Sequence, residues 1–147
     1  MMSRFVTILV LVIGLMGPQT SQSNARDNAT GISNPLLEIT DLTSGGSEVA
    51  IQLDLAGLEA LETTEIVTST LWTDGVNRFE GVPLRSLLNG FDLDGRNLRA
   101  VAINDYVVEI PLDDDRTESA ILAYRMNGAP MSRRGKGPLW IIYPFDQ

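Results

Sequence analysis

Three short stretches of the sequence place polar side chains beside aromatic ones, and they form the candidate functional site. They are residues 70–75 (TLWTDG), residues 104–106 (NDY) and residues 134–137 (RGKG), the last followed closely by Trp140. Each has the composition of a loop, and loops carry much of the binding chemistry of proteins because a rigid scaffold holds them in place. The side chains of these stretches can stack a ligand on indole rings, accept hydrogen bonds at carboxylates, and attract anions or carbonyl groups.

The aromatic component of this site comes from Trp72 and Trp140, the two tryptophans of the chain. Either indole offers a flat apolar face to a heteroaromatic ring, or to a cation. Trp140 lies in the apolar run PLWIIYP, so packing within a buried strand is the more ordinary explanation for it. Trp72 lies in a predicted loop, where ligand contact and packing are equally reasonable.

Asp74 and Asp105 are the carboxylates placed to accept a pair of N–H donors, because an ionised carboxylate presents two oxygens side by side. Both also sit in turn sequences, since Asp74 precedes Gly75 and Asp105 follows Asn104. Asp and Asn often bond their own backbone in turns. A purely local turn role is therefore the alternative for each.

A basic cluster of Arg133, Arg134 and Lys136 stands out in a chain of formal net charge -8. The neighbouring Gly135 and Gly137 permit close approach of backbone N–H groups, so the cluster suits an anionic or carbonyl-rich ligand. A docking face for a partner protein or a solvated turn before the last strand are the alternatives. The acidic run at residues 113–115 lacks the spacing of a calcium loop and is interpreted as a solvated turn.

Composition excludes several classes of function. The chain has no cysteine and no histidine, which removes disulfides, thiolate ligands, the commonest general base and the usual zinc ligand. The net negative charge argues against nucleic acid as a partner. We therefore expect a binding protein rather than an enzyme, and no metal site.

The first 25 residues have the pattern of an export signal. Arg4 precedes a mostly apolar run at residues 5–16, and Ser23 and Ala25 supply small residues for cleavage before Arg26. An uncleaved membrane anchor is the alternative. Cleavage leaves 122 of the 147 residues, enough for one domain. The expected organisation is a signal peptide at 1–25, a flexible lead-in at 26–34 and a single domain at 35–147, in the periplasm.

Hydrophobic periodicity predicts a chain of short strands with two or three short helices. Strands are expected at residues 35–40, 47–55 and 64–70, on both sides of the Asn104-Asp105 and Asn127-Gly128 turns, and at 138–144 as a strand buried on both faces. Further turns are expected at 44–46 and at Asp74-Gly75. Helices are expected within 54–62, with Asp54 as N-cap, and from Pro83 to Gly90. This pattern predicts a mixed α+β fold with a largely antiparallel or mixed sheet.

Four segments in order resemble the molybdopterin-binding oxidoreductase domain of sulfite oxidase type. They are TSTLWTDGVNRFEGVPLRSLL, AVAINDYVVEIPLDD, ILAYRMNGAPM and KGPLWIIYP, within residues 68–144. The likeness extends over most of residues 35–147 and is strongest to the short, exported, stand-alone branch of that family. The resemblance implies a compact α+β sulfite-oxidase-type molybdopterin-binding fold with a mixed sheet and short helices.

The resemblance also implies a ligand. Enzymes of the family hold molybdenum through a cysteine thiolate in a loop that corresponds to about residues 68–70, where this chain has Thr-Ser-Thr. Hydroxyl groups lack the softness of that thiolate. Short members are similar to periplasmic proteins that bind a reduced pterin and pass its state to a membrane-bound cyclic-di-GMP signalling protein. A reduced pterin is thus the expected ligand, with molybdopterin as the alternative.

By the same resemblance each candidate residue acquires a role. Trp72 would stack on the pterin ring, and Asp105 would accept from its N3–H and 2-amino group. Side chains that would donate to the ring carbonyl or the polyol tail are those of Asn104, Tyr106, Arg134 and Lys136, assisted by the amides of Gly135 and Gly137. The short branch often has an acidic residue where this chain has Gly135. The full predicted set is Trp72, Asp74, Asn104, Asp105, Tyr106, Arg134, Lys136, Gly137 and Trp140.

Three functions compete at this point. The first is a non-enzymatic periplasmic pterin-binding protein that signals to a membrane partner. The second is a molybdopterin-dependent oxidoreductase or redox accessory that lacks the cysteine ligand. The third is a ligand-free interaction domain, in which Trp72 and Asp105 serve only packing and turn formation.

Overall fold

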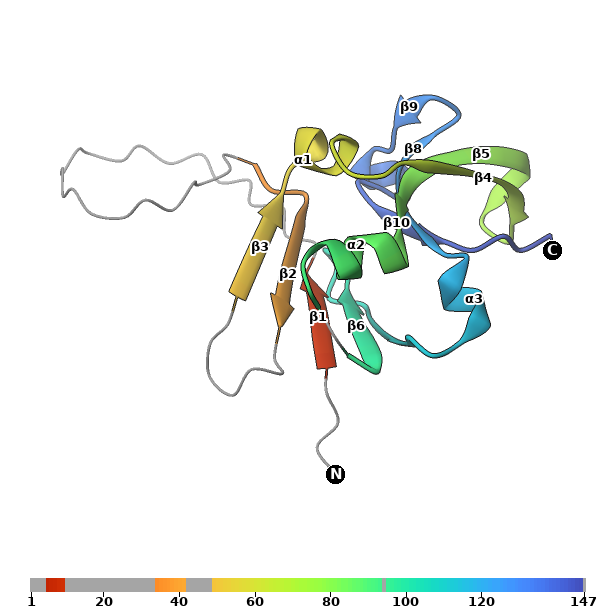
Figure 1. Cartoon of the computed structure of the whole chain (residues 1–147). Coiled ribbons are helices and arrows are strands. Elements are labelled where there is room, and N and C mark those ends of the chain that lie inside the picture. Colours follow the sequence, from red (N-terminus) through yellow and green to blue (C-terminus); the bar gives the residue numbers. More distant parts are fainter. Residues whose placement is uncertain (1–4, 10–33, 42–48, 94, 147) are drawn as a thin grey trace, which may run out of the picture.

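The chain folds into two β-sheets with short helices packed beside them (Figure 1). This computed structural model describes residues 5–9, 34–41, 49–93 and 95–146. Strands contribute far more of the described chain than helices do. The fold is therefore mostly β with a few short helices, which is compatible with the mixed fold predicted from the sequence.

The first sheet contains the five strands β1 (Phe5–Leu9), β2 (Leu37–Asp41), β3 (Val49–Leu53), β6 (Asn97–Val101) and β7 (Val107–Pro111). Their spatial order is β3-β2-β1-β6-β7. All neighbours are antiparallel except β1 and β6, which run parallel. This sheet is therefore mixed, and β1 is its middle strand.

The second sheet contains β4 (Thr64–Thr70), β5 (Thr73–Pro83), β8 (Ile121–Met126), β9 (Ala129–Pro130) and β10 (Trp140–Ile142). Its order is β10-β8-β5-β4, and β9 pairs with β8 across a hairpin turn. Every pair in it is antiparallel.

The helices are short, and the three α-helices begin directly after residues that favour a helix start. They are α1 (Leu55–Glu59), α2 (Leu84–Gly90), α3 (Asp115–Glu118) and the 3-10 helix η1 (Arg133–Gly135). The Asp54 side chain accepts from the Gly57 N–H at 2.8 Å, which confirms it as the N-cap of α1. Pro83 precedes the first residue of α2. In the acidic run, Asp114 caps α3 by accepting from the Arg116 N–H, so a short helix begins where only a solvated turn was expected.

One hydrophobic core joins the two sheets to α1 and α2. Its fully buried members come from β2, β5, β6, β8 and both helices, and include Leu37, Ile39, Leu58, Val82, Leu84, Leu98 and Leu122. Phe79, Ile121, Ala123, Met131 and Ile142 form a second cluster under β10. The core therefore lies between the sheets and leaves the ends of the hairpins free to build a site.

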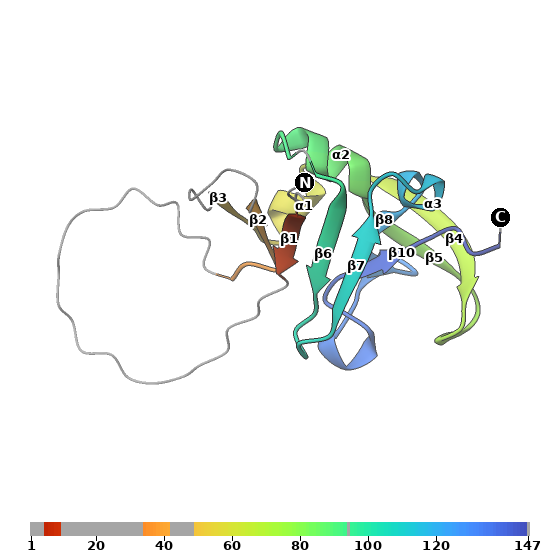
Figure 2. The same cartoon turned by 90° about the horizontal axis from the view of Figure 1, so that it is seen from below.

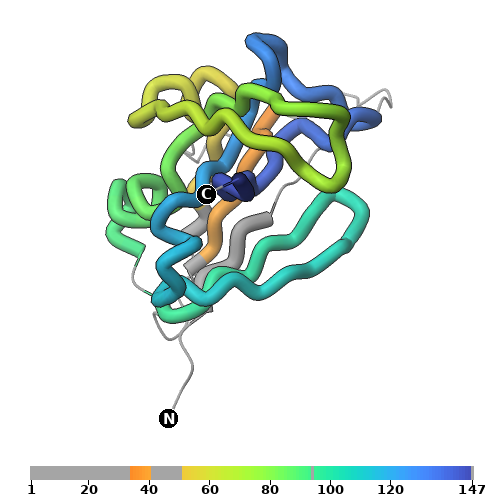
Figure 3. Tube along the Cα trace, turned by 90° about the vertical axis from the view of Figure 1, so that its right-hand side faces the viewer, coloured from red at the N-terminus to blue at the C-terminus, as the bar shows by residue number. Residues whose placement is uncertain are grey.

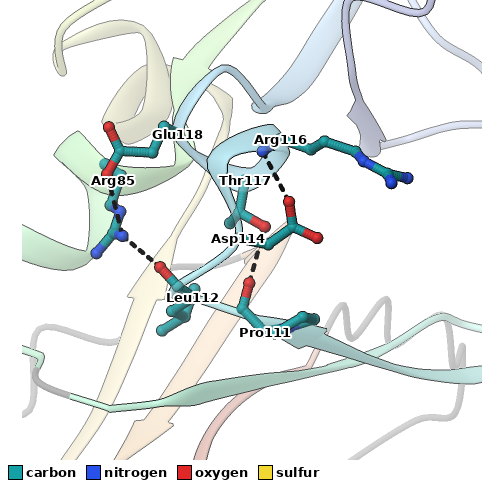
Figure 4. A network of polar contacts seen from close by, with 7 residues as sticks. All are labelled: Arg85, Pro111, Leu112, Asp114, Arg116, Thr117 and Glu118. Atoms are coloured by element: carbon teal, nitrogen blue, oxygen red, sulfur yellow. Dashed lines mark hydrogen bonds and ion pairs between the residues drawn. The ribbon is translucent and has the colours of Figure 1, made fainter.

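Polar contacts join α2 and α3 to the C-terminal end of β7, which is the end away from the β6–β7 turn (Figure 4). The Arg85 guanidinium donates to the Leu112 carbonyl and pairs with Glu118 at 3.2 Å. The Thr117 hydroxyl donates to the Pro111 carbonyl at 2.8 Å. The end of β7 is thus fixed from two helices, and the β6–β7 hairpin extends from a rigid base.

Most predicted elements are confirmed, with two corrections. The hairpin between β4 and β5 turns at Leu71 and Trp72, whereas Asp74 and Gly75 lie within β5, where the register with β4 shifts. The final strand is fully buried only at Ile142, because a cleft opens along its other residues. The ten described strands include some that the sequence analysis did not predict, among them Phe5–Leu9.

Residues 10–33 and 42–48 lie outside the described residues. The cleavage position before Arg26, most of the lead-in and the turn at 44–46 fall there, so these remain predictions. Among the residues that the structure describes, no helix is both long and apolar enough to cross a membrane.

Candidate functional site

A cleft of about 750 Å³ opens where the ends of the two sheets meet. Its walls come from the β4–β5 turn, the β6–β7 hairpin and the segment that runs from η1 through β10 to Phe145. Figures 2 and 3 show the C-terminal segment passing between the β4–β5 and β6–β7 hairpins. Three parts of the sequence that are distant from one another therefore enclose one space.

Seven of the nine predicted site residues line this cleft. They are Trp72, Asn104, Tyr106, Arg134, Lys136, Gly137 and Trp140. Asp105 lies between two of them at the tip of the β6–β7 hairpin without lining the wall, and Asp74 lies outside it. The structure thus brings all three predicted loops together, while the two carboxylates hold different positions relative to the cleft.

The two tryptophans meet edge to face in the cleft wall. Their ring centroids are 6.0 Å apart with an interplanar angle of 65°. Trp140 also packs edge to face on the buried Phe79, at 5.8 Å, so it serves both the core and the cleft. Trp72 keeps 56% of its surface exposed. Trp140 therefore anchors the indole pair, and Trp72 offers the free aromatic surface.

The Trp72 turn is held by hydroxyl groups. The side-chain oxygens of Thr70 and Thr73 are 2.8 Å apart, and the Thr70 oxygen accepts from the Trp72 N–H at 3.2 Å. The Asn77 amide donates to the carbonyls of Asp74 and Gly75. This network explains why the turn forms at Leu71 and Trp72 instead of at Asp74 and Gly75, and it turns Asp74 into part of a bulge.

The β6–β7 turn has the local chemistry of an Asx turn. The Asn104 side chain accepts from the Tyr106 N–H at 3.4 Å, and the Asp105 N–H donates to the Ala102 carbonyl at 3.0 Å. Asp105 adopts a left-handed backbone with φ of 63°, which Asp tolerates better than most residues. The local turn role considered for Asn104 and Asp105 therefore describes their backbone correctly. Among the described residues, no side-chain hydrogen bond uses the Asp105 carboxylate.

The basic loop is closed on itself by a single carbonyl. The N–H groups of Gly135 and Gly137 both donate to the Ser132 carbonyl, at 2.9 and 2.8 Å. In this arrangement both amides stabilise the loop, so neither N–H is free to donate to a ligand as predicted. A Cβ added to Gly137 would lie 2.2 Å from the Met131 carbonyl oxygen, so only glycine fits at this close approach.

The basic side chains themselves remain exposed at the cleft mouth. Arg133, Arg134 and Lys136 all line the cleft, and no ion pair between described residues involves any of them. Lys136 has a left-handed backbone with φ of 79°, which ends η1. In a chain of net charge -8, this rim is a local positive region suited to an anion or a carbonyl group.

The apolar wall contains residues that were not predicted as site residues. They include Ile103, Val108, Ile110, Ile141, Tyr143 and Phe145. Ile141, Tyr143 and Phe145 alternate with the buried Ile142, which is strand periodicity. This periodicity could have identified Ile141, Tyr143 and Phe145 as cleft residues from the sequence alone. Burial raises the pKa of the Tyr143 phenol above its usual value, so this ring enters the wall in its neutral form.

Residues 68–70, where the family resemblance implies a metal ligand, are held by the C-terminal segment. The Asp146 carboxylate accepts from the Ser69 N–H and from the Ser69 hydroxyl, both at 2.6 Å. It also accepts from the Thr68 hydroxyl at 3.2 Å. These hydrogen bonds hold the pKa of Asp146 below its usual value. None of residues 68–70 lines the cleft.

The donor set around this position does not suit a metal. Among the described residues, no group of three or more carboxylate, histidine or cysteine side chains could hold an ion. Cysteine is missing from the whole sequence, so the thiolate ligand that the family resemblance implies for molybdenum cannot come from this chain. The hydroxyls of Thr68 and Ser69 already donate to Asp146. The position therefore fits a structural hydrogen-bond cluster.

Comparison with known proteins identifies a protein family. The family model described as "Oxidoreductase molybdopterin binding domain" matches residues 32–145. The matched region contains every cleft residue named above. None of the curated proteins compared with the chain matches it.

Proposed function

This chain belongs to the oxidoreductase molybdopterin binding domain family, and we propose that it binds a reduced pterin without metal and acts as a non-enzymatic periplasmic sensor. In this proposal the bound pterin is reported to a membrane-bound cyclic-di-GMP signalling protein. The observation that carries the binding part is the convergence of three predicted loops on one cleft. The location and the partner follow from the export pattern and from the resemblance to the short branch.

The cleft suits a bicyclic heteroaromatic ligand. Its volume of about 750 Å³ lies within the usual range for small-molecule sites, which are mostly apolar with a few polar groups. Trp72 supplies an exposed indole face for stacking, while Tyr143 and Ile141 supply an apolar wall. A pterin ring has the flat faces and the polar edge that such a site requires.

The polar edge of the pterin would meet the β6–β7 turn. The Asp105 carboxylate is the acceptor for the N3–H and 2-amino donors, as a bidentate charge-assisted pair. Asn104 and Tyr106 would donate to the ring carbonyl, and Arg134 and Lys136 to the tail. One stacked ring with one bidentate pair corresponds to about micromolar affinity.

The residues present fit the organic part of molybdopterin but not its metal. The pterin half could use the same indole, carboxylate and basic rim. The metal half would need the thiolate that this chain lacks, and residues 68–70 are bonded to Asp146 instead. The family match favours molybdopterin-dependent chemistry as the second candidate. Metal-free molybdopterin is the form of that ligand that the described residues suit.

Ligand identification separates these candidates. The full-length gene is expressed for export, the protein is purified from the periplasm, and native mass spectrometry, absorbance and metal analysis are applied before acid release of the ligand. We expect a reduced pterin at one per chain without stoichiometric molybdenum. Stoichiometric molybdenum with molybdopterin would establish the second candidate. A protein that is empty and does not bind added tetrahydropterin would favour a ligand-free interaction domain.

A further inference from the structure

Strand β1 occupies the middle of the first sheet, between two hairpins that are otherwise complete. It pairs antiparallel with β2, from Val6 opposite Asp41 to Leu9 opposite Glu38. It pairs parallel with β6, from Phe5 opposite Asn97 to Leu9 opposite Val101. On their other edges β2 pairs with β3 and β6 pairs with β7. Figure 2 shows β1 between β2 and β6.

The same five residues lie in the predicted export signal. Cleavage before Arg26 would remove β1 and leave a gap one strand wide, with the backbone groups of β2 and β6 unpaired along it. Leu37 and Ile39 on one side and Leu98 on the other are fully buried in the core, so this gap would adjoin the core. Unpaired strand edges bind other extended chains readily.

We propose that the processed protein accepts an extended apolar segment of another protein chain in the place of β1. The segment would run antiparallel to β2 and parallel to β6 and would complete the five-stranded sheet. This proposal rests on the export part of the proposed function and is independent of pterin binding. It assigns a partner-binding surface on the sheet itself, and this surface adjoins the cleft at Ala100 and Val101, which pair with Ile8 and Leu9 and also line the cleft.

The geometry of the gap determines the kind of occupant. A strand that fills it must have both edges free, because β2 and β6 both pair with it. Every other strand in the described part of the chain already pairs with at least one neighbour. A second copy would therefore have to unfold a sheet to supply one. An extended segment that has no partners of its own meets the requirement.

The chemistry of the occupant follows from the segment it replaces. Phe5–Leu9 reads FVTIL, which is rich in β-branched and aromatic residues of high strand propensity. The lead-in RDNATGISN is the chain's own competitor for the gap, but its charged, Asn and Gly residues are depleted in strands. We therefore expect a partner segment of about five residues with the apolar, β-branched character of FVTIL.

A peptide titration tests the proposal. The protein is exported from its full-length gene, purified after processing, and mixed with a synthetic peptide of residues 4–10, RFVTILV. Intact mass first establishes that the chain begins at Arg26. We expect the peptide to raise Tm saturably by about 4 °C or more, which is a readily measured stabilisation for a domain of this size.

The matched control is the same peptide with Thr7→Pro. Proline has no N–H and does not fit the middle of a sheet, so this peptide should leave Tm unchanged. Equal shifts from both peptides, or no shift from either, would overturn the proposal, the second result indicating that the gap closes or that the lead-in fills it. A purified chain that retains residues 1–25 would also overturn it, since the gap then never opens.

A cleavage-blocked chain adds a test within the protein. Ala25→Tyr removes the small residue required for cleavage, so β1 should stay in place and peptide binding should fall at least tenfold. Undiminished peptide binding by this variant would contradict the assignment of the site to the β1 position. Tetrahydropterin is titrated into both proteins in parallel. If neither protein binds tetrahydropterin while the processed protein still binds the peptide, the result counts against the proposed function and leaves the strand-acceptor proposal standing.

Discussion

Two corners of this molecule treat their polar groups in opposite ways. At the cleft mouth and the neighbouring tip of the β6–β7 hairpin, the side chains of Arg134, Lys136 and Asp105 make no hydrogen bond or ion pair with described residues. At residues 68–70, the hydroxyls of Thr68 and Ser69 are engaged by Asp146. The first region, which we call the open corner, is accessible to a ligand. In the second, which we call the engaged corner, the side chains are bonded to the chain itself.

The difference separates the two halves of a metal–pterin cofactor. The open corner lies beside the indole pair and suits a pterin ring. The engaged corner is where the family resemblance implies the metal ligand, and its hydrogen bonds replace that ligand with a structural contact. The comparison is the physical basis of our proposal that the chain binds a pterin without a metal. The following predictions test each corner, beginning with the largest effect.

The strongest test of the open corner is Trp72→Ala. Stacking of a heteroaromatic ring on an aromatic side chain is worth about 1–3 kcal/mol, so we expect pterin affinity to fall by about tenfold or more. Titration calorimetry with tetrahydropterin measures the change. Trp72→Phe is the matched control and should recover most of the affinity, because it retains an aromatic face. Unchanged affinity in the alanine variant would remove Trp72 from the site.

The next effect is that of Asp105→Asn. The variant loses a charge-assisted acceptor but keeps a side chain that tolerates the left-handed backbone. We expect pterin binding to weaken by about 1 kcal/mol or more, with little change in Tm. Equal binding by the two proteins would exclude Asp105 from ligand contact. An early thermal transition would instead show that its main role is in the turn.

The basic rim should contribute less and more selectively. The double variant Arg134→Gln with Lys136→Gln removes two exposed charges that form no ion pair with described residues. Exposed charge interactions are worth about 0.5–1 kcal/mol, so affinity for a pterin with a phosphate-bearing tail should fall by twofold to fivefold. A pterin with a neutral tail should be affected less. Equal losses for both ligands would indicate that the rim orders the loop instead of binding the tail.

The sequence predicted the elements that local chemistry determines. The Asp54 cap, the strand at Thr64–Thr70 and the hairpin at Asn127 and Gly128 were all found from residue type and spacing. The position of the β4–β5 turn was missed, because Asp-Gly is a strong turn signal and the hydroxyl network of Thr70 and Thr73 is not visible in the sequence. Which strands are neighbours, and the place of Phe5–Leu9 among them, depends on tertiary packing.

The candidate site shows the same division. Motif reading found the three loops, and the fold brought them together as one cleft. The sequence motifs did not show that the amides of Gly135 and Gly137 are already bonded to Ser132. They also gave no signal for the bond between Asp146 and Ser69, since these residues are 77 positions apart. Contacts between distant residues are set by the fold, so local patterns cannot report them.

The engaged corner is tested by Asp146→Asn, with the smallest expected effect. Hydrogen bonds from Ser69 and Thr68 lower the pKa of Asp146 below its ordinary value of 3.8, so the ionised form is favoured in the folded state. The stabilisation is therefore present at neutral pH and is lost as the pH falls below about 4. At pH 7 the variant should unfold at a slightly lower temperature than the wild type, and the two Tm values should converge in acid. Asp113→Asn is the matched control, because the Asp113 side chain makes no hydrogen bond with described residues. A constant difference between variant and wild type across this pH range would show that the Asp146 charge does not maintain the contact with residues 68–70.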